Sequence, residues 1–149
     1  MFMDYLDGPN LELWNKRKDW IEKILDDESA LGGYEVSEQA CALMMDLQVV
    51  FCAGAWVSVI ILSMSIIDAQ LREVEIPGFQ GNTEKLIKSI GLTDELDWLR
   101  IRRNKLLHIN PDNPEITVDD QWSKREEMEI EARRAIRLVV MVLFLSPFV

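Results

Sequence analysis

Apolar positions along the chain recur with helical spacing, and glycine and proline residues divide them into segments. From residue 11 to about residue 31, apolar side chains repeat every three or four positions before Gly32-Gly33, which indicates one amphipathic helix that ends at the glycines. Ser37 can cap a second helix that continues to about residue 74 unless Gly54 kinks it. No segment shows the alternation of paired strands, so the pattern predicts an all-α protein.

The second half of the chain predicts two further helices before a loop. Thr83 and Gly91 bracket a short third helix. Thr93 can cap a fourth helix that continues to Leu107 or His108, because Asn110-Pro111 then disfavours helical backbone.

A last helix is predicted from about residue 124. Ser123 and Glu126 have the spacing of a capping box. The chain has 149 residues, of which 48% are hydrophobic, enough to fill one core. We therefore expect a single helical domain over residues 1–149.

The uncharged stretch over residues 47–67 admits two interpretations. It is about long enough to span a bilayer, but it contains Gln48 and several serines, and its flanking residues are the acids Asp46 and Asp68. The alternative is a central helix that is buried all round, by its own domain on one side and by a second subunit on another. We favour the buried helix and expect no membrane association.

Charge and cysteine content narrow the function classes. A net charge of −10 argues against proteins that hold nucleic acid over a wide basic surface, so any contact with RNA must be local. Cys41 and Cys52 lie eleven positions apart in one predicted helix, roughly 16 Å, which is too far for a disulfide. This spacing fits a cytoplasmic protein.

Reactive groups gather in the hexapeptide from Arg103 to His108, which contains the only histidine of the chain. Arg103 offers a fixed cation for a phosphate, Asn104 a hydrogen-bonding amide, and His108 a group that exchanges protons near neutral pH. Clusters of histidine and cysteine with metal-ligand spacing and glycine-rich phosphate loops are not found, so we expect neither metal nor cofactor.

A helical wheel separates these groups. Arg103 falls within a leucine stripe, and a buried guanidinium requires a carboxylate or an anionic ligand. Asp68 is one candidate carboxylate and Glu73 is a weaker one, and the pair with Asp68 would serve either helix packing or a functional site. His108 lies about 40° from Asn104 but about 140° from Arg103 on the wheel, so a bend in the helix or a second copy of the motif must bring them together.

Residues 96–108, with the motif Arg103-Asn104 and four intervening residues before His108, resemble the signature helix of the HEPN family (higher eukaryotes and prokaryotes nucleotide-binding domains). Residues 60–71, which include Asp68, resemble that family's second helix. The resemblance implies a four- to five-helix bundle that dimerises so that two motifs face one cleft.

Many HEPN domains are metal-independent endoribonucleases and act as toxins whose partner is an antitoxin protein. The resemblance implies that Arg103 binds the scissile phosphate, Asn104 orients it, and His108 acts as general acid or base. Attack by the RNA 2′-hydroxyl would then give a 2′,3′-cyclic phosphate.

A short basic strip for RNA could be formed by Arg100, Arg102, Arg103 and Lys105, with Lys85 and Lys88 as further candidates. Besides Arg103, we expect Arg100, Arg102 and Lys105 to bind the RNA. Inactive HEPN domains also occur, so a non-catalytic dimerisation or partner-binding module is the alternative. In that case Arg103 and Asp68 fix packing and His108 caps a helix.

Overall fold

The protein is described here by a computed structural model that covers residues 8–30 and 32–146. The first half holds α1 (Leu11–Ser29), α2 (Glu38–Ala53), α3 (Trp56–Gln70) and a π-helical turn, η2 (Leu71–Glu75). The second half holds α4 (Thr83–Ile90), α5 (Thr93–Leu107), α6 (Val118–Ser123) and α7 (Arg125–Leu143). These residues form seven α-helices and no strand. The all-α prediction is confirmed, with more helices than the four or five expected.

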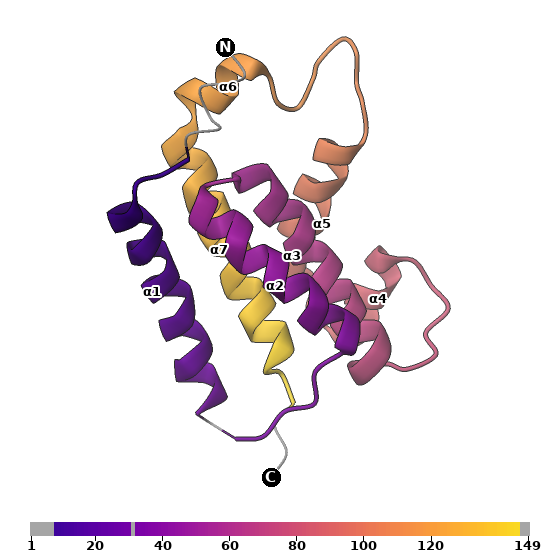
Figure 1. The fold of residues 1–149 in the computed structure, drawn as a ribbon. Coiled ribbons are helices and arrows are strands. Elements are labelled where there is room, and N and C mark those ends of the chain that lie inside the picture. Colours follow the sequence, from indigo (N-terminus) through magenta and orange to yellow (C-terminus); the bar gives the residue numbers. More distant parts are fainter. Residues whose placement is uncertain (1–7, 31, 147–149) are drawn as a thin grey trace.

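Helix α3 forms the centre of the fold. It packs most extensively against α2 and α7 and also contacts α5, while α1 contacts α2 and α7. In Figure 1, α7 lies between α1 and α3, with α2 in front of α3. The α3 side chains Val59, Met64 and Ile67 are completely buried. The central helix is therefore buried largely by its own chain, as its uncharged sequence indicated.

The long second helix of the sequence prediction is two helices in the structure. Gly54 adopts φ +79° and ends α2, and α3 begins two residues later at Trp56. This left-handed conformation suits glycine, which has no Cβ to clash with the carbonyl. None of the helices in residues 8–30 and 32–146 is both long and apolar enough to cross a membrane.

Two arginines from distant helices meet at this junction. Arg17 of α1 donates through Nη1 to the Cys52 carbonyl (3.1 Å), and Arg125 of α7 donates through Nη2 to the Gly54 carbonyl (2.6 Å). Both guanidinium groups lie over the Trp56 ring, 4.8 and 5.4 Å from its centroid. Two positive groups thus bind carbonyls at the negative end of α2 and stack on the first residue of α3.

Arg17 is a buried charge, with 7% of its surface exposed. Burial lowers the pKa of its guanidinium, and the Glu129 carboxylate, 3.6 Å from Nη2, opposes that shift. A guanidinium keeps its proton even in such surroundings. Removing the Arg17 side chain would therefore leave the Cys52 carbonyl without its charged donor and would remove one ion pair of Glu129, which also pairs with Arg133.

Helix caps follow the prediction at one position and depart from it at two. Ser37 caps α2, where its Oγ accepts a hydrogen bond from the N–H three residues on (3.1 Å). Thr93 does not cap α5 but lies inside its first turn. Ser123 ends α6 instead of capping α7, and the capping box belongs to Thr117 and Asp120 at the start of α6. The prediction missed α6 because it is only six residues long.

We predict that Gly54→Ala destabilises the fold more than the same change at another left-handed helix end. A Cβ at Gly54 would lie 3.1 Å from Arg17 Nη1 and 3.2 Å from Arg125 Nη2, whereas one at Gly91 (φ +77°) meets nothing within 4 Å. Strain alone costs Gly91→Ala about 1 kcal/mol. Displacing the arginines should raise the loss at Gly54 to about 2–3 kcal/mol. Urea unfolding followed by circular dichroism measures both, and equal losses would contradict the role given to the arginines.

We also predict that the two free thiols react at different rates. Cys41 is exposed and Cys52 is buried. Burial raises the pKa of the Cys52 thiol, and the nearby Arg17 only partly offsets this. A raised pKa leaves less thiolate at a given pH, and the thiolate is the nucleophile. With Ellman's reagent at pH 8, one thiol should react quickly and the second only after denaturation; Cys41→Ser should abolish the fast phase alone.

Candidate functional site

Helix α5 carries the predicted motif and ends at it. Its first turn holds Asp94 and Glu95 and its last turn holds Lys105, an arrangement that suits the helix dipole. His108 adopts extended backbone (φ −100°, ψ 123°), although its N–H still donates to the Asn104 carbonyl (3.0 Å). The helix therefore stops just before Asn110-Pro111, as predicted.

The leucine stripe of α5 is buried only in its first part. Leu96 and Leu99 are fully buried against the core, but Leu106 is half-buried and Leu107 is 51% exposed. Arg103 is half-buried. The helix thus projects beyond the core at its C-terminal turn, which places the motif at the surface.

The structure gives Asp68 partners other than Arg103. One carboxylate oxygen of Asp68 accepts from Arg72 Nε (2.9 Å) and the other accepts from Thr83 Oγ1 (2.9 Å). Within residues 8–30 and 32–146, no ion pair joins Asp68 to Arg103. The predicted pair of Asp68 with Arg103 is wrong. Arg72 lies four residues after Asp68, one helical turn away, and binds its carboxylate instead. The supporting role given to Asp68 therefore lacks this geometric basis.

Asn104, Lys105 and His108 line one open hollow of about 400 Å³ at the end of α5. Arg103 is not among its lining residues, but its Nε donates to Asn104 Oδ1 (2.9 Å). Arg103 is thus connected to the hollow through Asn104. The remaining lining residues come from the loop after α5: Ile109, Asn110, Asn113 and Glu115.

The three basic residues predicted to bind RNA differ in whether a carboxylate neutralises them. Arg100 pairs with Asp97 (3.1 Å). Arg102 pairs with both Glu115 and Glu131. Lys105 is exposed and lines the hollow, and no ion pair involves it in the part of the chain that the structure describes. Of these three residues, only Lys105 therefore offers the hollow a positive charge without an ion pair in the described part of the chain. Contact of RNA with Arg100 and Arg102 stays a prediction.

Sequence reasoning missed the loop's contribution to the hollow. Asn110-Pro111 and Asn113-Pro114 served in the prediction only as helix breakers. In the structure Asn110 Oδ1 accepts from the backbone N–H of Asp112 (3.2 Å) and so stabilises the turn that carries the loop back toward α5. An asparagine before proline is a known turn signal and could have indicated this return.

Comparisons with protein-family models, with curated proteins and with solved structures give no match for this chain. The HEPN resemblance therefore rests on the motif and on the order of helices around it. Function has to be argued from the hollow itself.

We predict that Arg102 holds the loop that forms one wall of the hollow. Its guanidinium connects α5 to Glu115 in that loop and to Glu131 in α7, whereas Arg100 pairs only within its own helix. Arg102→Ala should therefore speed amide hydrogen exchange over residues 109–117 severalfold, and the matched Arg100→Ala should leave it unchanged. Equal exchange in the two variants would show that the loop is held by other contacts.

Proposed function

We propose that this protein is a metal-independent endoribonuclease whose reaction takes place in the hollow at the end of α5. One observation carries the proposal: a cation, an amide and the only imidazole of the chain meet there. Asn104, Lys105 and His108 line the hollow, and Arg103 is hydrogen-bonded to Asn104. These groups match the needs of phosphodiester cleavage.

Cleavage by this route needs two proton transfers and charge stabilisation. A base removes the proton of the 2′-hydroxyl, the 2′ oxygen attacks phosphorus, and the bond to the 5′ oxygen breaks. An acid protonates the leaving 5′ oxygen, which gives a 2′,3′-cyclic phosphate and a 5′-hydroxyl. His108 serves as acid or base, while Arg103 and Lys105 bind the phosphate and Asn104 orients it.

A homodimer would supply both proton-transfer groups. Each chain has one histidine, so a second copy facing the same RNA would bring the second imidazole. Leu107 and Ile109, on either side of His108, are 51% and 91% exposed, and apolar side chains in such positions suit burial by a partner. We therefore propose that two hollows face each other across the dimer axis.

Glu115 in the hollow favours a second candidate, a non-catalytic module that binds an antitoxin-like protein. Glu115 lines the same hollow as His108 and uses Arg102 as its partner, so it adds no positive charge for a phosphate, and the exposed Ile109 suits a protein contact. The two candidates differ in one result, namely whether purified protein cuts RNA.

We predict that the protein cleaves mixed-sequence RNA in the presence of EDTA and that His108→Ala slows cleavage by about 10²- to 10⁴-fold, the usual contribution of a general acid or base. Gel analysis of end-labelled RNA measures the rate, and mapping of the ends should find cyclic phosphate and 5′-hydroxyl groups. RNA methylated at every 2′ oxygen should stay intact, because its nucleophile is blocked.

Lys16→Ala, a change on the exposed surface of α1, is the matched control for contaminating nucleases when it is purified in the same way. It should cleave like the unmodified protein. Cleavage that is equally fast in His108→Ala would remove the histidine from the mechanism, and a complete lack of cleavage would favour the binding module.

A further inference from the structure

The middle of α7 carries two exposed arginines. Arg134 and Arg137 are exposed, and neither forms an ion pair within residues 8–30 and 32–146. Their neighbour Arg133 differs, because it pairs with Glu129 (3.3 Å). No acidic residue follows Glu131 in the sequence. An anionic ligand would therefore meet two available guanidinium groups here.

Three carboxylates on α1, α5 and α7 already have partners. Glu131 pairs with Arg102, Asp97 pairs with Arg100, and Asp27 pairs with Lys23 at 2.8 Å. Because these acids are neutralised locally, the net charge of −10 does not describe the potential at this segment. The two arginines form a local positive site on an acidic protein.

Each of the two arginines lies over an indole ring. The Arg134 guanidinium is 4.0 Å from the centroid of Trp98 on α5, and that of Arg137 is 5.2 Å from the centroid of Trp20 on α1. This stacking fixes long side chains before a ligand arrives and lowers the entropy lost on binding. Guanidinium planes and aromatic rings are also surfaces on which unpaired bases stack.

The outer face of α5 connects this segment to the hollow. Trp98, Ile101 and Lys105 follow one another at spacings of three and four residues, so they share a face of the helix. Ile101 and Lys105 are exposed. The rise from Trp98 to Lys105 is about 10 Å, a distance that a few nucleotides span. A strand that leaves the hollow at Lys105 can therefore reach Trp98.

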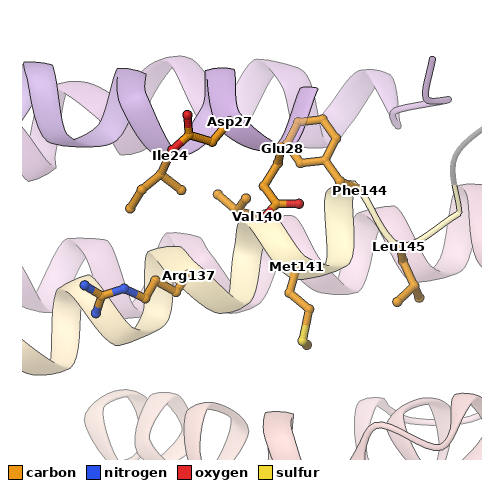
Figure 2. A pocket seen from close by; sticks show the side chains of 8 residues that line it. All are labelled: Ile24, Asp27, Glu28, Arg137, Val140, Met141, Phe144 and Leu145. Atoms are coloured by element: carbon orange, nitrogen blue, oxygen red, sulfur yellow. The ribbon is translucent and has the colours of Figure 1, made fainter. Parts of the chain in front are cut away.

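A groove of about 500 Å³ lies between α1 and α7, and Arg137 is one of the residues that line it. Figure 2 shows Arg137 at one end of this groove and Phe144 with Leu145 at the other. Asp27 and Glu28 of α1 line the same groove. Asp27 pairs with Lys23, but no ion pair within residues 8–30 and 32–146 involves Glu28, so the Glu28 carboxylate would repel a phosphate that passed beyond Arg137.

We propose that Trp98, Arg134 and Arg137, here named the α7 strip, bind single-stranded RNA outside the hollow. Arg134 and Arg137 bind neighbouring phosphates, since their spacing of three residues puts them one helical turn apart. A base stacks on the Trp98–Arg134 pair. The choice of RNA as ligand rests on the proposed function. The flat, indole-stacked guanidinium groups and the exposed path to the hollow favour RNA over an acidic protein.

A probe that cannot be cleaved separates binding from catalysis. The probe is a fluorescein-labelled 12-nucleotide RNA, methylated at every 2′ oxygen, and fluorescence anisotropy measures its Kd from 50 to 200 mM KCl. Arg134→Ala and Arg137→Ala should each weaken binding about five- to tenfold at 50 mM KCl. Each should also reduce the slope of log Kd against log salt by about 0.7, the value for one phosphate contact on a single strand.

Further variants test the stacking and the fold. Trp98→Leu should weaken binding about tenfold without changing the salt slope, because it removes a stacking surface and no charge. Arg134→Lys should restore the slope but not the full affinity. Lys16→Ala changes the net charge as much as Arg134→Ala does and should bind normally. Thermal unfolding of every variant verifies that it is folded.

The outcomes distinguish this proposal from the proposed function. Cleavage that depends on His108, with normal probe binding by the arginine variants, would overturn the strip and leave the nuclease. Probe binding that depends on Arg134 and Arg137, without any cleavage of unmodified RNA, would support the strip and overturn the nuclease. A poly-glutamate peptide that binds through the same arginines more tightly than RNA would assign the strip to an acidic protein and overturn the proposal.

Discussion

The fold depends on two arginines that bind the carbonyl end of α2. Arg17 and Arg125 come from α1 and α7, donate to the Cys52 and Gly54 carbonyls and share the Trp56 ring. Four helices are thereby connected at one point. A tight junction between two apolar helices would otherwise bury carbonyls without donors, which costs free energy. Gly54 is the residue that leaves room for both guanidinium groups.

This junction determines where α5 and its motif lie. With α3 fixed between α2 and α7, α5 occupies another side of α3. Its contacts with α7 are then the Arg102–Glu131 ion pair and the stacking of Arg134 on Trp98. The last turn of α5 extends past the core, so the motif is held from one end by packing and remains open at the other. Such a position is typical of sites that a rigid scaffold presents to a ligand.

Local periodicity predicted most of the helices, but it could not predict the partners of charged side chains. The helices predicted over residues 11–31 and 93–108 correspond to α1 (Leu11–Ser29) and α5 (Thr93–Leu107), because apolar spacing and terminal breakers agree there. The arginine bonds at Gly54 join residues 35 and 71 positions apart, and no local pattern encodes such contacts. The failed pairing of Asp68 with Arg103 is different, because the competing Arg72 stands at helical spacing and could have been recognised from the sequence.

Around the candidate site, the local charge depends on which basic residues form ion pairs, and the composition of the chain does not reveal this. Two of the three basic residues expected to bind RNA, Arg100 and Arg102, are neutralised by carboxylates. Arg134 and Arg137, which were not predicted to bind RNA, form no ion pair within the residues that the structure describes. The hollow itself gains one free cation, Lys105, and one acid, Glu115. Phosphate binding therefore needs charge from outside a single hollow. In the proposed mechanism, a second subunit would supply this charge by doubling the cations as well as the imidazoles, and the α7 strip would supply it within one chain by binding the strand farther along. These two sources act on different phosphates, so assembly and strand binding would contribute independently to the reaction.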